Sequence, residues 1–433
     1  MSVQAASRSR TRRAPKHRTL LAKLQALGPG LITGAADDDP SGISTYSVAG
    51  ASTGLSMLWL ALLTTPMMAV IQGMCARIGM VTGLGLAANI KKSVPAWAAY
   101  TMALAVIAAN TFNVGADFAG MSASAHLVVP LIPVPVWVLI FGAMLFAAMM
   151  YLSYQRLAAV IKWLTLSLFA YIVAAFVVRP NWWAVLRHLV VPEVHLNREW
   201  LTTMMGVLGT TITPYLFFWQ SSLAVEEEKC AGRETLADRR GATRDEIHYA
   251  HFDVNAGMIL SNAVMFFIVA TTALTLFAHG KTNIATAQDA ARALEPLAGH
   301  FAALIFTLGM VGTGLLAIPA LAGSSAYVAA ETFAFYGGGL DETPNRAPRF
   351  YGVAGAGLLL GVLMCFTRLD PIRALYWSAV LNGLVAVPLI FLLIRIASSA
   401  GIMGEWVSGR AAKIWAWVTF AFMAVAAVAL FAV

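Results

Sequence analysis

The sequence predicts an all-α protein that crosses a membrane many times. Of its 433 residues, 59% are hydrophobic and only 12% are charged, whereas an average soluble domain carries about 25% charged residues. Apolar stretches recur along the whole chain, and most reach the roughly 20 residues that a helix needs to cross the hydrocarbon core. No low-complexity linker separates them. We therefore predict one polytopic membrane domain embedded in a lipid bilayer.

The apolar stretches define eleven expected spans, joined mostly by short polar loops. These spans are residues 24–52, 57–81, 97–126, 132–152, 157–178, 201–225, 253–278, 300–335, 350–367, 373–396 and 411–432. Three basic stretches, namely Lys91 with Lys92, residues 229–244, and Arg346 with Arg349, fall on the side of the N-terminus. Because basic loops stay in the cytoplasm, this side is expected to be cytoplasmic. Residues 179–198, expected outside, carry three arginines and argue weakly against this orientation.

Residues 1–23 form a basic tail ahead of the first span. The tail holds seven of the 29 basic residues and no acid, so the formal charge of +8 is mostly local. Such a segment beside a first span is typical of a cytoplasmic N-terminus, and we do not expect it to bind nucleic acid. The predicted location is therefore the plasma (inner) membrane, with many passes. Residues 24–433 are expected to form the single transmembrane domain.

The first span contains an acidic break. Asp37, Asp38 and Asp39 are followed by Pro40, Ser41 and Gly42. Carboxylates inside a membrane are costly and usually line a cavity or bind polar cargo. Irregular backbone at that depth is tolerated where it is buried in protein or lines a pathway. An acid and a helix break in one span therefore indicate a cation site.

The sixth span repeats this oddity without the charge. Residues 209–214 read Gly-Thr-Thr-Ile-Thr-Pro, which alone would indicate only a kinked helix. However, this break lies five spans after the first one. Paired interrupted spans at matching positions of two halves indicate an inverted-repeat transporter. The expected repeats are about 24–178 and 201–396, and the span at 411–432 is an addition.

Four segments resemble the Nramp-type divalent metal transporters. They are residues 28–30 with 39–42, residues 72–87, Pro214 with 221–223, and residues 370–373. The resemblance covers about residues 28 to 396. It implies a LeuT-like inverted repeat whose first and sixth spans are broken. It also implies inward transport of divalent metal, which many members couple to protons.

The chain departs from this family at the residues that hold the ion. The family motif Asp-Pro-Gly-Asn keeps its acid as Asp39, but its asparagine position is Gly42. The motif Met-Pro-His, whose thioether binds metal, reads Thr213-Pro214-Tyr215 here. A glutamine of the tenth span falls on Ala379, with Asn382 three residues later.

These departures replace a soft site by a hard one. A thioether favours transition metals, whereas alkaline-earth ions prefer oxygen. The expected ligands are the Asp39 carboxylate, the Thr213 hydroxyl and carbonyls freed near Ala36 and Thr210, with room left by Gly42. Magnesium dehydrates reluctantly and is commonly bound through one or two carboxylates and several waters. The chain thus resembles the Nramp-related magnesium transporters, a divergent branch of the family.

A second set of polar residues is expected to line the ion route. Asn113 and Asp117 lie one turn apart in the third span and share a helix face. The other members of this set are Asp38, Tyr215 and Asn382. For the asparagines, the alternative interpretation is simple hydrogen bonding between helices. We expect weak or no proton coupling, because Tyr215 replaces the histidine and Val114 replaces the third-span acid nearest the site.

Other interpretations remain open. The nearest is a proton-coupled manganese or iron symporter with different ligands. An amino-acid transporter on the same fold is disfavoured, because the acids at 37–39 would repel a substrate carboxylate. An enzyme is disfavoured because no metal-binding histidine pair, nucleophile elbow or phosphate loop is found. We therefore expect no cofactor, a metal ion as substrate and a monomer. The polar stretch 226–250 is predicted to be a solvated cytoplasmic loop.

Overall fold

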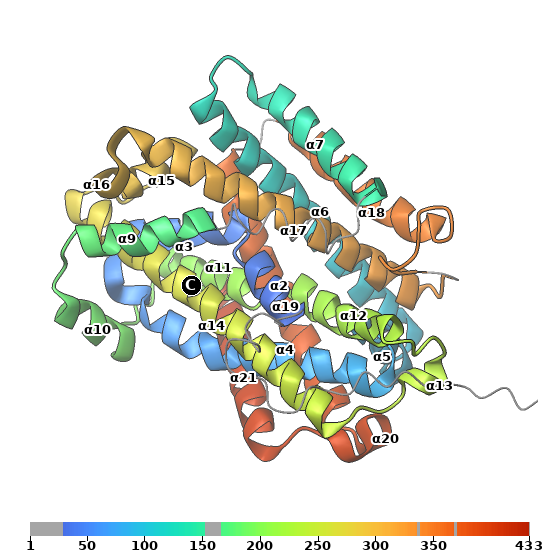
Figure 1. Ribbon diagram of the computed structural model, residues 1–433. Coiled ribbons are helices and arrows are strands. Elements are labelled where there is room, and N and C mark those ends of the chain that lie inside the picture. The colour runs from blue at the N-terminus through green and yellow to red at the C-terminus, as the bar shows by residue number, and fades with distance from the viewer. Residues whose placement is uncertain (1–28, 152–165, 336–337, 368–369, 433) are drawn as a thin grey trace, which may run out of the picture.

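The structure, a computed structural model, describes residues 29–151, 166–335, 338–367 and 370–432, and its regular elements there are all helical (Figure 1). The predicted tail 1–23 lies outside the described residues, as does the first part of the predicted fifth span. The first half contains α2 (Pro29–Asp37), α3 (Pro40–Thr53), η1 (Gly54–Met57), α4 (Trp59–Thr82), α5 (Leu86–Ser93), α6 (Ala96–Val128), α7 (Val134–Tyr151), η2 (Leu166–Leu168), α9 (Phe169–Val177) and α10 (Trp182–Val190).

The second half begins with α11 (Arg198–Thr211), α12 (Pro214–Cys230), α13 (Leu236–Arg239), α14 (Arg244–Thr275) and η3 (Phe277–His279). It continues with α15 (Ala287–Ala291), η4 (Arg292–Leu294), α16 (Glu295–Ala298), η5 (Gly299–Phe301), α17 (Ala302–Thr332), α18 (Pro348–Met364), α19 (Pro371–Ala397), α20 (Ala400–Met403), η6 (Gly404–Trp406) and α21 (Arg410–Ala432). Within the described residues, eight helices are long and apolar enough to cross a membrane, and α18 is a shorter apolar helix. The first expected span is divided into α2 and α3.

The broken helices lie inside the helical bundle. Helix α2 packs against α14, α12 and α17, whereas α3 packs against α14, α11 and α19. Helices α6 and α17 run side by side and flank this centre (Figure 1). In contrast, α7 and α21 turn large apolar side chains outward, including Phe146 and Phe431. An apolar outer face around buried polar breaks is the arrangement that a bilayer requires.

Small residues allow the broken helices to approach their neighbours. A Cβ at Gly34 of α2 would lie within 2.7 Å of the backbone of Gly257 in α14. A Cβ at Gly209 of α11 would collide with the Ala379 carbonyl and with the backbone of Gly383 in α19. Close backbone approach through small residues is a common packing mode of membrane helices. Both breaks are thereby held close to an unbroken helix.

The predicted loop 226–250 is wrong at both ends. Helix α12 continues to Cys230, and α14 already begins at Arg244. Glu226 accepts hydrogen bonds from the Tyr327 hydroxyl and, at 2.7 Å, from the backbone N–H of Leu340. Glu228 pairs with Arg233. Helix α12 can include these acids because groups of α17 and of the following loops form hydrogen bonds or ion pairs with their carboxylates. The local run of charge does not reveal these distant partners.

Candidate metal site

The first break is built around Asp39. Helix α2 ends at Asp37 and α3 begins at Pro40, whose missing N–H suits the first helical position. Asp39 is the N-cap of α3, and its Oδ1 accepts the backbone N–H of Gly42 at 2.6 Å. A carboxylate at a helix N-terminus is stabilised by the helix dipole. The acid that marks the break therefore also fixes its geometry.

The second carboxylate oxygen of Asp39 starts a polar chain across three helices. Asn113 of α6 donates to Asp39 Oδ2 at 3.1 Å and also lies 3.3 Å from Asp117 Oδ2. Asn382 of α19 donates to Asn113 Oδ1 at 3.2 Å. All four side chains are buried. The structure thus places Asp39 beside three residues of the expected second set.

Oxygen atoms from both breaks surround the space beside Gly42. A Cβ at Gly42 would lie 3.3 Å from Thr210 Oγ1, 3.4 Å from Asp39 Oδ1 and 3.5 Å from the Asp37 carbonyl oxygen. Thr210 belongs to α11, whereas the other two residues flank the first break. An asparagine at position 42 would therefore enter the same space. Because Gly42 has no side chain, a carboxylate, a hydroxyl and a carbonyl oxygen approach one another closely at this position.

The sixth span breaks between Thr211 and Pro214. Thr213 takes the N-cap position of α12 in an extended conformation, but its hydroxyl makes no capping bond. This Oγ1 atom is buried and has no hydrogen-bond partner. Buried polar atoms are rarely left unsatisfied without a functional reason. The Thr213 hydroxyl is thus a neutral oxygen available to a ligand.

The Ala36 carbonyl at the end of α2 is engaged by the second broken span. Tyr215 of α12 donates its hydroxyl to this carbonyl at 2.6 Å. The Tyr215 carbonyl in turn accepts the Ser324 hydroxyl of α17 at 2.9 Å. Of the backbone carbonyls expected near the ion, that of Ala36 therefore already accepts a hydrogen bond from a side chain.

The three consecutive acids divide between two helices. Asp39 faces α6, whereas Ser261 of α14 lies 2.6 Å from Asp37 Oδ2 and 3.2 Å from Asp38 Oδ1. Ser261 was not among the residues predicted from the sequence. The feature that could have indicated it is its position four residues after Gly257, the residue of α14 that lies against Gly34 of α2. Small residues at such spacing commonly mark a helix interface.

Negative charge at the first break has no basic counterpart. The ion pairs found in the described residues involve none of Asp37, Asp38, Asp39 and Asp117. Buried charges are normally paired or bind a metal. Across the same described part of the chain, no group of three or more His, Cys, Asp or Glu side chains could hold a metal.

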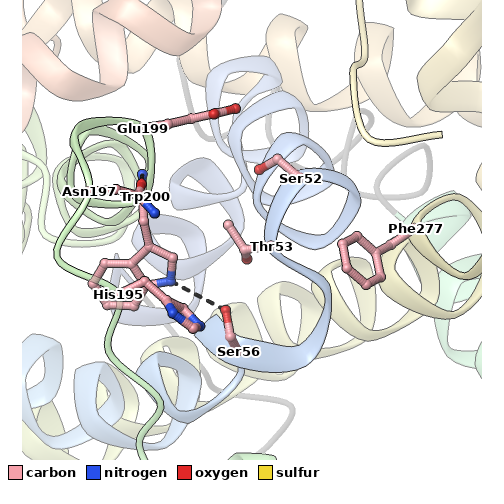
Figure 2. Close-up of a pocket in the computed structure, with 8 residues that line it drawn as sticks. All are labelled: Ser52, Thr53, Ser56, His195, Asn197, Glu199, Trp200 and Phe277. Carbon is pink, nitrogen blue, oxygen red and sulfur yellow. Dashed lines mark hydrogen bonds between the residues drawn. The ribbon is translucent and has the colours of Figure 1, made fainter. Parts of the chain in front are cut away.

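A cavity of about 240 Å³ lies at the other ends of α3 and α11, away from both breaks (Figure 2). Trp200 donates its Nε1–H to Ser56 Oγ at 3.3 Å in this cavity. Glu199 is its one carboxylate. The lining residues are Ser52, Thr53, Ser56, His195, Asn197, Glu199, Trp200 and Phe277. None of them belongs to the expected metal site.

Solved structures place the fold among the LeuT-like transporters. The chain superposes on the manganese transporter of Eremococcus coleocola with a TM-score of 0.74 and 15% identity, covering 98% of this chain and 90% of the other. It also matches Mhp1, a nucleobase-cation-symport-1 family transporter, with a TM-score of 0.57, 14% identity, and coverage of 93% and 89%. The predicted all-α LeuT-like fold, with its first and sixth spans broken, is confirmed.

Sequence comparison then defines the family. Residues 30–433 match the family model "Nramp: Natural resistance-associated macrophage protein-like". The chain is 30% identical over 414 residues to the "Divalent metal cation transporter MntH" of Klebsiella pneumoniae, with 92% of each chain covered. It is 32% identical over 304 residues to MntH of Yersinia enterocolitica, covering 68% and 69%. The chain belongs to the Nramp family and is a multi-pass membrane transporter, not an enzyme.

Proposed function

We propose that the chain imports divalent metal cations by alternating access and prefers Mg²⁺. The observation that carries this proposal is the set of oxygens around the Gly42 space, supplied by Asp39, Thr210 and Asp37. The Thr213 hydroxyl replaces the thioether of the family motif and is the further ligand. Hard oxygens favour hard cations over soft transition metals. The cation is the substrate, and the protein needs no cofactor.

The number of charged ligands supports a hydrated ion. Asp39 is the one acid of the first break that faces the Gly42 space with a side-chain oxygen. Magnesium commonly keeps several waters and binds through one or two carboxylates. Asn113, Asn382, Asp117 and Asp38 line the route around it.

We infer that protons are coupled weakly or not at all. Tyr215 stands where coupled members carry a histidine, and the tyrosine hydroxyl does not titrate near neutral pH. Histidine is the side chain best suited to gain and lose a proton there. The membrane potential alone supplies about 2.3 kcal/mol per elementary charge per 100 mV. That driving force is sufficient for inward movement of a divalent ion.

We also propose an orientation of the chain in the membrane and a division into two repeats. Helix α5, the α12–α14 connection and the start of α18, whose sequences carry basic residues, lie toward the same side of the molecule, on the right in Figure 1. We assign this side, with the N-terminus, to the cytoplasm of a plasma (inner) membrane. Residues 24–178 and 201–396 are the two repeats, the span 411–432 is an addition, and the protein acts as a monomer.

Manganese transport is the second candidate. The relatives with solved structures include a manganese transporter, and the Met265 sulfur lies 3.8 Å from Thr211 Oγ1 beside the sixth break. A thioether at this position would favour a softer ion. This candidate predicts that manganese outcompetes magnesium and that protons accompany the metal.

Uptake into proteoliposomes under a fixed membrane potential tests the proposal. We expect saturable Mg²⁺ uptake, with intravesicular pH changing no faster than in empty vesicles. Metal-dependent acidification above that leak would reject weak coupling and point to Asp117 or Asp38 as carrier. Absence of any divalent uptake by correctly inserted protein would reject the function itself.

A further inference from the structure

We propose that Tyr215 determines metal selectivity by keeping the Ala36 carbonyl hydrogen-bonded, so that the transported cation retains a water at that position. This inference rests on the proposed function. It concerns one contact that joins the two breaks, the bond of 2.6 Å from the Tyr215 hydroxyl to the carbonyl at the end of α2.

The tyrosine is fixed at both ends. Its side chain is 1% exposed and belongs to the same buried cluster as Phe118 and Trp219. Its hydroxyl reaches α2, and its own carbonyl accepts the Ser324 hydroxyl of α17 at 2.9 Å. If this buried ring swung aside, it would lose the hydroxyl bond to α2. The hydroxyl is therefore held in position to donate its hydrogen bond to the Ala36 carbonyl.

The bond occupies an oxygen that a cation would otherwise use. The last carbonyls of a helix lack an N–H partner within the helix, and α2 ends one residue after Ala36. Leaving such a buried acceptor unpaired costs about 1–3 kcal/mol. The Tyr215 hydroxyl removes this cost without a metal. Its hydrogen also directs positive charge toward the oxygen, which opposes a cation there.

An oxygen of the sixth break and one of the neighbouring helix α6 differ in this respect. Thr213 Oγ1 and Asp117 Oδ1 are buried and have no hydrogen-bond partner. They are accessible to a ligand without breaking a protein bond. The carbonyl of Ala36, in contrast, already uses one of its two lone pairs for the bond with Tyr215, which weakens it as a ligand. The site therefore offers few direct ligands and leaves the remaining positions to water.

This restriction discriminates between hard cations. Mg²⁺ keeps several waters, whereas Ca²⁺ takes six to eight oxygen ligands in flexible geometry. A carbonyl released from Tyr215 adds a direct protein ligand, which benefits Ca²⁺ more than Mg²⁺. Tyr215 thus selects against the larger cation, although it does not contact either ion.

The test compares Tyr215→Phe with Tyr376→Phe in proteoliposomes. The control, Tyr376 of α19, also forms a hydroxyl bond between two helices, because its oxygen lies 3.1 Å from Thr203 Oγ1 of α11. Thr203 lies about two helical turns before the sixth-span break. We expect Tyr215→Phe to lower the ratio of apparent Mg²⁺ to Ca²⁺ affinity by about two- to tenfold, the value of one hydrogen bond. Tyr376→Phe should leave the ratio unchanged.

Three results separate the possible failures. An unchanged ratio in an active Tyr215→Phe protein, or an equal change in Tyr376→Phe, would overturn the inference. If Tyr215→Phe does not fold, Ser324→Ala, which frees the tyrosine backbone, must shift the ratio in the same direction, and no shift would again overturn it. Absence of Mg²⁺ and Ca²⁺ uptake by the unmutated protein would instead reject the proposed function.

Discussion

The two helix breaks share a design but differ in charge. Each places a proline at the first position of the following helix, after an extended N-cap residue. At the first break, the N-cap Asp39 bonds its own helix and joins a polar chain through Asn113 to Asn382. At the sixth break, the N-cap Thr213 bonds nothing. We therefore propose that the first break supplies the binding energy and the sixth supplies the selectivity.

Removing the charge of the first break should have the largest effect. Asp39→Ala eliminates the one side-chain carboxylate at the Gly42 space, so the cost of partly dehydrating the cation is no longer offset. We expect divalent uptake to fall to that of empty vesicles, while membrane insertion persists. The matched control is Asp245→Ala, an exposed acid in the first turn of α14. Uptake near the parental rate in Asp39→Ala would remove the proposed site.

Changing the sixth break should alter preference more than rate. Thr213→Met, ideally combined with Gly42→Asn, restores a thioether and an amide of the family motifs. Because a soft ligand benefits soft ions, apparent Mn²⁺ or Cd²⁺ affinity should rise relative to Mg²⁺. Thr203→Met, two turns earlier on α11, is the control for added side-chain volume. An unchanged preference in the double variant would contradict the proposal that the sixth break determines selectivity.

The polar chain should matter less than the charge that it holds. Asn113→Ala removes the donor to Asp39 Oδ2 and the link to Asn382. Hydrogen bonds to charged groups contribute about 1.5–3 kcal/mol. We expect all divalent affinities to weaken by about tenfold or more, with their order preserved. Binding titrations of Mg²⁺, Mn²⁺ and Ca²⁺ would check this, and a changed order would assign Asn113 to selectivity.

The smallest effect is expected on the α14 side. Ser261→Ala removes the hydroxyl beside Asp37 and Asp38 but leaves Asp39 and the Gly42 space intact. Because this hydroxyl bonds Asp37 and Asp38 and not the proposed ligand Asp39, Mg²⁺ affinity should change by less than in Asn113→Ala. Parallel uptake curves for the two variants provide the comparison. A greater loss in Ser261→Ala would show that Asp37 or Asp38 belongs to the binding site.

Local signals predicted the parts of this protein that depend on local physics. Apolar length predicted the eight long apolar helices of the described residues, and proline beside acid or hydroxyl predicted both breaks at residues 39–40 and 213–214. The same signals brought Asp39, Asn113 and Asn382 to attention only as separate residues. Their hydrogen bonds join positions 74 and 269 residues apart, and no local pattern encodes such pairing.

The contacts that could not be predicted from the sequence join helices that lie far apart along the chain. Tyr215 was interpreted through the residue that it replaces, whereas its bond to Ala36 depends on how α12 meets α2. Ser261 carries no charge and no motif. The acids at 226–228 were assigned to a loop because their partners, including Tyr327 and Leu340, lie about a hundred residues away.

Competition between cations for the unmutated protein tests the central claim most directly. Mg²⁺ uptake into proteoliposomes would be measured while Cd²⁺ or Mn²⁺ is added at increasing concentration. If hard oxygens at the breaks select the cargo, a severalfold excess of Cd²⁺ should leave most Mg²⁺ uptake intact. If Cd²⁺ or Mn²⁺ instead displaces Mg²⁺ at concentrations far below its own, a softer ligand holds the ion, and the assignment of the sixth break is wrong.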